Sequence, residues 1–291
     1  MKKNILQMCI FVPYLICLTA VGLSGLEWPV QEFKPTHFFG QRSEQGMETG
    51  LILENSGTVR ASADGTVLLR LEENTNMSGF PNALGNTVIL THDDGLLTVY
   101  GNLDSIDRVS EASHVELSSI LGKTGSSGWG NPTDCIFQVI DQTKKTILNP
   151  LMLLPGFKDR HAPNIRNVVL VSQNGQTIAP GSVDAVRQGT YRLYADICDT
   201  IDNASTELSP FRITVLINGK EHTLIPFEQM KESDGKLYLS SPAFTRDTFY
   251  SDPTRIFLGE ISLIRGQADI SLMVKDTAGN ERSVLFGLQI D

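Results

Sequence analysis

Short apolar segments alternate with turn-forming residues along almost the whole chain, and this pattern limits what the chain can fold into. Glycine and proline separate runs rich in Val, Ile and Leu, and no run keeps the 3.6-residue hydrophobic period of an amphipathic helix. Segments of this kind are typical of β-strands. We therefore expect an all-β protein, and a length of 291 residues favours two domains over one small core.

The first half of the chain contains several segments with the composition of strands. They are residues 67–71, 87–90, 96–100 and 136–140. An Asp64-Gly65 turn joins two extended runs between positions 57 and 67. The polar segment Glu72–Leu84 is typical of a long surface loop, and such loops often carry binding residues.

The second half follows a polar, proline-containing linker at Lys158–Pro163. Its strand-like segments are residues 168–171, 190–197, 211–217, 222–225, 270–274 and 283–289. Asn218-Gly219 predicts a tight hairpin between two of them. The Asp276–Asn280 turn resembles the final hairpin of bacterial immunoglobulin-like domains. We expect an immunoglobulin-like β-sandwich over residues 158–291 that folds independently of the first half.

Residues 1–24 have the features of a secretory signal peptide. Lys2 and Lys3 precede the apolar stretch Ile5–Val21, and Ala20 and Gly22 offer small side chains near a cleavage point. An uncleaved membrane anchor is the alternative, but the apolar stretch is short and interrupted for a membrane span. We expect cleavage and export to the periplasm or cell envelope.

The charge of the chain excludes several classes of partner. The formal net charge is −9 at pH 7, and the acidic excess is larger before residue 158 than after it. Such a surface repels phosphate backbones and anionic lipid head groups. We expect no binding to nucleic acid and no peripheral binding to membranes.

Cysteine and histidine spacing gives no sign of a metal site. Cys9 and Cys17 lie in the signal segment, which leaves Cys135 and Cys198, one in each half. We expect two buried free thiols. The histidines form no His-x-His or His-x-x-x-His pair, and Cys-x-x-Cys is absent.

The order of strands and glycine turns between Gly85 and Pro150 carries the most specific resemblance to a known family. Its parts are the segments 85–95, 97–103, 121–128 and 134–139, followed by Asn149-Pro150. This order, over about residues 33–155, resembles the lysostaphin/LytM family of zinc endopeptidases, which cut the peptide crosslinks of bacterial cell walls. The resemblance implies that residues 27–157 form an antiparallel β-sheet with a groove on one face.

The positions that hold zinc and activate water in active relatives carry other residues here. Phe39-Gly40-Gln41-Arg42 matches the family's Phe-Gly-x-Arg motif, and Gly50 anchors the first ligand segment. The degenerate ligand positions are then Glu48, Ile52 and Ile136, and the degenerate catalytic positions are Asn102 and Asp134. Isoleucine has no lone pair, and the amide of asparagine is not a general base. We therefore expect a pseudoenzyme with no cofactor, although active relatives use zinc.

The remodelled groove is the expected binding surface. Its predicted border consists of Glu48, His92, Tyr100, Asn102, Trp129 and Asp134. Carboxylates, an amide and aromatic faces suit a peptide that carries amines. In one alternative the two isoleucines close the groove, and Trp129 is either an exposed rim residue or a partly buried staple.

Three functions are compatible with these residues. We expect a non-catalytic envelope protein that binds peptidoglycan or a protein partner, and regulation of wall hydrolysis is a role that fits such binding. The first alternative is an endopeptidase with an atypical zinc site. The second is a structural two-domain spacer in the envelope.

Overall fold

The computed structural model describes residues 25–43, 46–72, 82–106, 113–202 and 206–291. The expected signal peptide, residues 1–24, and most of the expected loop at 72–84 lie outside the described residues. Within the described ranges, the helices lack the length and apolar character of a membrane span.

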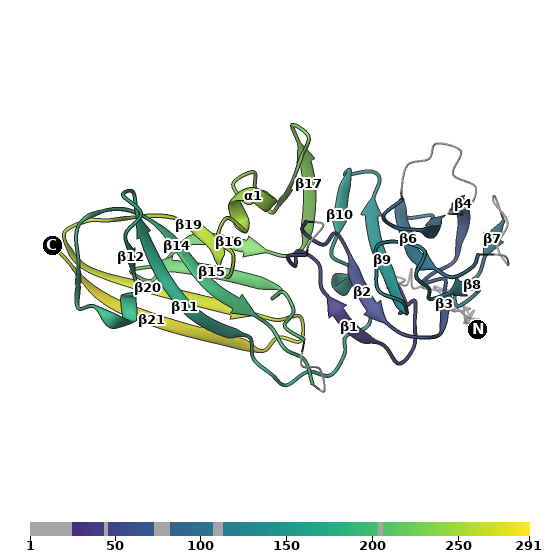
Figure 1. Cartoon of the computed structure of the whole chain (residues 1–291), viewed down its shortest axis with the longest axis horizontal. Helices are drawn as coiled ribbons and strands as arrows, with labels where there is room; N and C mark the ends of the chain where they lie inside the picture. Colours follow the sequence, from purple (N-terminus) through teal and green to yellow (C-terminus); the bar gives the residue numbers. More distant parts are fainter. Residues whose placement is uncertain (1–24, 44–45, 73–81, 107–112, 203–205) are drawn as a thin grey trace, which may run out of the picture.

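The first half of the chain forms a large antiparallel sheet, here called the front sheet (Figure 1). Its strand order is β18-β17-β10-β9-β6-β5-β4-β7, with β2 also pairing with β9 and β1 with β2. The bounds are β1 Lys34–His37, β2 Leu51–Glu54, β4 Gly65–Leu71, β5 Asn86–Thr91, β6 Leu96–Leu103, β7 His114–Val115, β9 Asp134–Asp141, β10 Thr146–Leu148, β17 Gln229–Ser233 and β18 Lys236–Leu239. The 3₁₀ turn η2, Pro150–Met152, follows β10.

The Asp64-Gly65 turn does not join two strands of one hairpin. The short strand before it, β3 (Thr58–Arg60), pairs with β8 (Ile120–Lys123) in a separate two-stranded sheet, while β4 after it belongs to the front sheet. The turn therefore redirects the chain from one sheet to another, because both strands find their partners far away in the sequence.

The front sheet has one buried face and one partly open face. Along β9, Cys135, Phe137 and Val139 are buried, whereas Ile136 and Gln138 between them are only partly buried. This alternation is the period-two pattern of a strand with a core on one side. Leu51, Leu53 and Tyr100 from the neighbouring strands lie in the same buried cluster, so the open face is the one that carries Ile136.

The second half forms a β-sandwich, here called the rear sandwich. One sheet has the order β12-β11-β14-β19 and the other β13-β21-β20-β15-β16. The bounds are β11 Asn164–Ser172, β12 Thr177–Ile178, β13 Ala185–Val186, β14 Gly189–Cys198, β15 Arg212–Ile217, β16 Lys220–Pro226, β19 Ile256–Leu263, β20 Gly266–Lys275 and β21 Glu281–Ile290, with the 3₁₀ turn η3 at Pro180–Ser182 and the helix α1 at Arg246–Phe249. Leu193 of one sheet and Leu272 of the other lie in one buried cluster. The all-β prediction is confirmed, and the immunoglobulin-like relationship stays a prediction.

Local sequence signals specified the turns of the rear sandwich. β15 and β16 pair with Ile217 opposite Lys220, so Asn218 and Gly219 alone form the hairpin loop. Both have positive φ, 52° and 75°, as a type I′ turn requires. The turn at residues 276–280 likewise joins β20 to β21. The prediction of two free buried thiols is also confirmed.

The two halves are joined by more than the linker. The β17–β18 hairpin comes from the second half, yet β17 pairs with β10 and extends the front sheet, as Figure 1 shows. In the opposite direction, Phe39 is fully buried in the core cluster of the rear sandwich. The Arg42 guanidinium donates to the backbone carbonyls of Asp252 and Pro253 and stacks on the Tyr250 ring at 4.5 Å. The boundary near residue 158 stays a prediction, but the halves share a sheet and a core across it.

Candidate functional site

A cavity of about 190 Å³ opens on the partly exposed face of the front sheet. Its lining includes Glu48, Thr49, Ile52, Trp129, Ile136 and Gln138. All three degenerate ligand positions therefore lie around one cavity, as the resemblance implied. The expected groove is present, and the two isoleucines do not close it.

Strand register brings the two isoleucines together. In the β2–β9 pairing, Ile52 lies directly opposite Ile136, and on the other side of β9 Gly101 of β6 is opposite Ile136 as well. Gly50 lets the chain enter β2 at this place, because a Cβ there would collide with the carbonyl of Phe137. The register therefore makes the floor of the cavity apolar.

The donors around the cavity do not fit a hydrolytic zinc ion. Such an ion needs three nitrogen, sulfur or carboxylate ligands and an open position for water. Among the described residues that line the cavity, Glu48 is the only carboxylate, and no histidine or cysteine is present. The side chains of Ile52 and Ile136 have no lone pair to donate, so no metal-dependent step can be derived from this site.

The polar groups that remain around the cavity are few and well placed for contacts. Glu48 is partly exposed. The Gln138 Nε2 atom donates a hydrogen bond of 2.7 Å to Thr49 Oγ1, which joins β9 to the segment before β2. Trp129 is 57% exposed, so it is a rim residue and not a buried staple. The cavity thus combines an apolar floor, one carboxylate and an exposed aromatic ring.

Asn102 is a structural residue beneath the neighbouring loop, which corrects the expectation that it borders the groove. It is fully buried, and its Nδ2 atom donates to the carbonyl oxygens of Gly125, Asn131 and Asp134 at 2.7, 3.0 and 2.9 Å. Its Oδ1 atom accepts from the Gly128 amide. With φ of 63°, Asn102 also occupies a left-handed conformation that asparagine tolerates better than most residues. Its donors are used within the protein, and because the side chain is fully buried it offers no surface to a ligand.

Asp134 also lies within the protein rather than at the groove border. It is 2% exposed, and its Oδ2 atom accepts a hydrogen bond from the Asn131 amide at 2.8 Å. Burial raises the pKa of this carboxyl above its ordinary value. Because Asp134 helps to shape the loop that Asn102 supports, it has a positional role in this fold.

Tyr100 and His92 require the same correction. Tyr100 is fully buried, and its hydroxyl accepts a hydrogen bond from the Ser62 amide at 2.8 Å. His92 is 9% exposed, with Nδ1 2.7 Å from the Asp64 carbonyl oxygen and Nε2 2.8 Å from Thr98 Oγ1. Both side chains connect neighbouring segments of the front half. Of the six predicted border residues, Glu48 and Trp129 line the cavity.

Sequence analysis missed a second group of side chains that chemistry could use. Asp159, Asp199 and Asp276 come close together although they are far apart in sequence, and Asp159 also lies close to His161 and Asp202. The Asp276–Asn280 turn was recognised from sequence only as a turn. Nothing in the spacing of these residues indicates that they meet.

Comparison with known proteins places both halves of the chain. Residues 46–150 match the model of peptidase family M23, and a separate family model matches residues 162–291. An uncharacterized protein of Treponema pallidum (strain Nichols) is 34% identical over 142 residues, which cover 44% of this chain and 96% of that protein.

Two solved structures are similar to part of the chain. The SpoIIQ–SpoIIIAH pore-forming complex has a TM-score of 0.37 and 22% identity, with 45% of this chain and 91% of that chain covered. The catalytic domain of the antimicrobial peptidase lysostaphin from Staphylococcus simulans has a TM-score of 0.35 and 22% identity, with 41% and 90% covered.

Proposed function

Residues 46–150 form a domain of peptidase family M23, and on this premise we propose that the chain is a non-catalytic protein of the cell envelope whose cavity binds a peptide without cutting it. The observation that carries the proposal is the pairing of Ile52 with Ile136 across β2 and β9. Two of the three ligand positions are apolar and face one another. Replacement of only one of these isoleucines by a metal-binding residue would not complete a set of three ligands.

The positions that would activate water support the same conclusion. Hydrolysis needs a group that accepts a proton from water within hydrogen-bonding reach of the substrate. At one of these positions stands Asn102, an amide that is buried and fully hydrogen-bonded. At the other, Asp134 is 2% exposed and bonded to the Asn131 amide. Neither residue is placed to act on a substrate in the cavity.

The cavity suits a short peptide that carries an amine. The Glu48 carboxylate offers a partner for an ammonium group, Ile52 and Ile136 accept an apolar side chain, and the exposed Trp129 ring offers a stacking surface. Peptidoglycan stem peptides combine amines with small apolar side chains. We therefore favour peptidoglycan as the ligand, with a protein segment of similar chemistry as the second choice. Export to the periplasm or cell envelope is part of the proposal.

Binding to purified wall sacculi tests the proposal. We expect a Glu48→Gln, Trp129→Ala variant to bind at least about tenfold more weakly than the unchanged chain, because it loses an ion pair and a stacking surface. Ile264→Ala is the matched control, since Ile264 is a large apolar residue with 79% exposure on the rear sandwich. Asn102 is unsuitable for this test because its replacement disturbs the fold.

The outcomes separate the three functions. Equal binding by the double variant and the unchanged chain would refute a binding role for the cavity. Loss of an envelope protein partner, but not of sacculi, in the double variant would favour the protein ligand. If neither ligand is captured by the unchanged chain, the structural spacer is the better description. Stoichiometric zinc with release of peptides from sacculi would establish the endopeptidase instead.

A further inference from the structure

Three aspartates meet at the end of the rear sandwich that faces the front half. Asp159 lies in the linker before β11, Asp199 directly follows β14, and Asp276 directly follows β20. One carboxylate oxygen of each lies within 4.8 Å of the corresponding oxygens of the other two. Because the residues come from three separate segments, a shared partner for these oxygens would bind the linker to both sheets of the sandwich.

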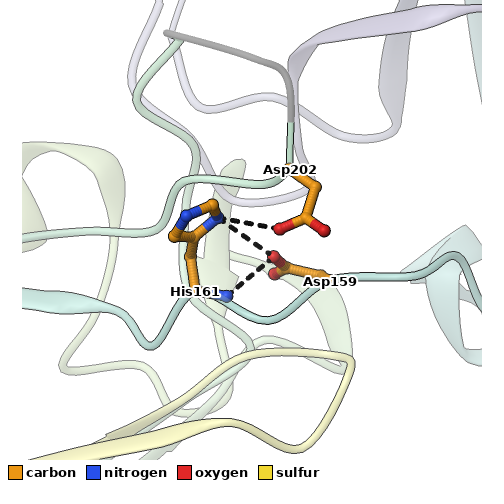
Figure 2. Close-up of side chains that lie close together, drawn as sticks. All are labelled: Asp159, His161 and Asp202. Atoms are coloured by element: carbon orange, nitrogen blue, oxygen red, sulfur yellow. Dashed lines mark hydrogen bonds and ion pairs between the residues drawn. The ribbon is translucent and has the colours of Figure 1, made fainter.

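The three carboxylates are removed from water. The side chain of Asp159 is 1% exposed, and residues Asp199 and Asp276 are 2% and 3% exposed. Within the described ranges, no lysine or arginine forms an ion pair with any of them. His161 is a neighbouring basic group, with Nδ1 3.7 Å from Asp159 Oδ1, but it lies closer to Asp202 Oδ1, at 2.9 Å (Figure 2). Buried carboxylates without a cation are costly, since burial and mutual repulsion both disfavour the charged forms.

One oxygen of Asp159 has no hydrogen-bond partner. Asp159 Oδ1 accepts a hydrogen bond from the His161 amide at 3.0 Å, whereas Asp159 Oδ2 is buried and makes no hydrogen bond; Figure 2 shows this second oxygen without a dashed line. A buried carboxylate oxygen without a donor is rare in folded proteins. It points to a ligand that carries positive charge.

Backbone and side-chain amides hold the other two aspartates in place. Asp199 Oδ1 accepts from the Thr200 amide at 2.9 Å. The two oxygens of Asp276 accept from the Asn280 amide and from Asn280 Nδ2, at 2.8 and 2.7 Å, and the same Nδ2 donates to the Asp159 carbonyl. These bonds orient the carboxylates but bring no positive charge. Burial, followed by the charges of Asp276 and Asp159, raises the pKa of Asp199 to about 8.

We propose that a calcium ion binds between Asp159, Asp199 and Asp276 and fixes the linker to the end of the rear sandwich. Calcium prefers carboxylate and carbonyl oxygens at about 2.4 Å, so two of its ligands can lie up to about 4.8 Å apart. The separations within the cluster agree with a common centre. Zinc is less suitable, because it prefers nitrogen and sulfur ligands in a tetrahedral arrangement, and the three central ligands are all oxygens.

The ion would make the linker part of the rear sandwich. Asp159 lies between η2 and β11 in the chain. Its attachment to Asp199 and Asp276 therefore limits how residues 158–163 can move. This effect is independent of the cavity on the front sheet. It predicts that calcium stabilises the chain and protects the linker from proteases.

Calorimetric titration of the full, EDTA-treated chain with calcium chloride tests the site. We expect about one calcium ion per chain and a rise in Tm of about 5 °C or more when free calcium is about a hundred times its Kd. Asp199→Asn and Asp276→Asn should each weaken binding at least about tenfold, because each removes one charged ligand. The substitution at position 199 keeps an oxygen for the Thr200 amide, and the substitution at position 276 keeps an oxygen for one of the two Asn280 donors.

Two controls make the result specific. Asp184→Asn removes the same charge from an exposed residue just before β13 and should leave calcium binding unchanged. His161→Ala should also leave it unchanged, because His161 is 59% exposed and contacts the outer carboxylate of Asp202. Circular dichroism confirms that each variant is folded.

Three results would overturn the proposal. The first is a lack of calcium uptake by the unchanged chain at millimolar calcium. The second is an equal loss of binding in Asp184→Asn, which would indicate a diffuse response to net charge. The third is zinc binding that calcium does not compete with and that His161→Ala abolishes. Calcium-dependent protection of residues 158–163 from trypsin, lost in Asp276→Asn, would support the proposed effect on the linker.

Discussion

The cavity on the front sheet and the aspartate cluster at the linker show opposite arrangements of metal-binding groups. The cavity contains the three positions that the resemblance assigns to metal ligands, yet Ile52 and Ile136 face one another there. The cluster lies where no sequence motif points, yet it gathers three carboxylates that are almost fully buried. In both regions the donor atoms present, and not the family to which a domain belongs, decide what can be bound.

The physical difference between the two regions is the cost of leaving them empty. An apolar floor needs no ion, because isoleucine side chains lose nothing when no metal is bound. Buried carboxylates without a cation are strained by desolvation and mutual repulsion. The front cavity is free to bind an organic ligand, while the cluster at the linker calls for a positive charge.

The strongest test of this contrast is to give the cavity the missing donors. The Glu48→His, Ile52→Asp, Ile136→His variant should raise zinc content after dialysis from below about 0.1 to about one ion per chain, because it supplies three ligands on paired strands. Atomic absorption on the purified chain measures this change.

A matched variant keeps the number of donors but not their arrangement. Glu48→His and Ile52→Asp combined with Ile140→His place the third ligand elsewhere on β9, opposite Leu97 and Ile147. This control should take up little zinc. If both triple variants bind zinc equally, the cavity is not organised around Ile136 and the contrast between the two regions fails.

Cys135 provides a test of the strand register on which the contrast depends. It precedes Ile136 on β9, points into the core, and burial raises its pKa to about 12. At a given pH near neutrality it should therefore form about a thousandfold less thiolate than an ordinary cysteine and react correspondingly slowly with iodoacetamide. Mass spectrometry of the native chain, with the urea-unfolded chain as reference, measures the rate. Rapid labelling of native Cys135 would mean that β9 is turned over and that Ile136 faces the core.

A smaller effect separates residues that shape the cavity from residues that line it. Asn102→Gly keeps a backbone that tolerates the φ of 63° but leaves three carbonyl oxygens without their amide donor. We expect a loss of about 3 kcal/mol in the free energy of unfolding. Trp129→Ala, at a residue with 57% exposure, should cost less than about 0.5 kcal/mol. Urea unfolding of both variants measures the two losses. A larger loss for Trp129→Ala than for Asn102→Gly would contradict the structural role of Asn102.

The accuracy of sequence-based prediction differed among these residues for physical reasons. Ile52 and Ile136 line one cavity, and their strands could be recognised because strand and glycine patterns specify this part of the sheet. Four other residues were expected at the border of the cavity but are buried: Tyr100, Asn102, Asp134 and His92. A polar side chain next to a groove can point into the groove or into the protein interior, and the local sequence does not decide between the two. Their orientation depends on hydrogen-bond partners such as Ser62 and Gly128, which come from other segments.

Long-range pairing was the other limit. Asp234 and Gly235 form the loop of the β17–β18 hairpin, with φ of 53° and 72°. Because Asp-Gly is typical of such two-residue loops, the sequence alone can indicate this hairpin. The position of this hairpin in the fold could not be predicted from the sequence. Its strand β17 pairs with β10, which lies in a distant part of the sequence. The burial of Phe39 in the core of the rear sandwich belongs to the same category.

The sequence by itself determined the all-β architecture, the hairpin at Asn218-Gly219 and the apolar side chains at positions 52 and 136, because these depend on local periodicity, turn geometry and side-chain chemistry. Tertiary structure decided which polar side chains face solvent, how the two halves share a sheet, and that Asp159, Asp199 and Asp276 meet. Those outcomes depend on contacts between distant segments. Whether a buried charge stabilises or destabilises the protein is decided by the groups that the fold places around it.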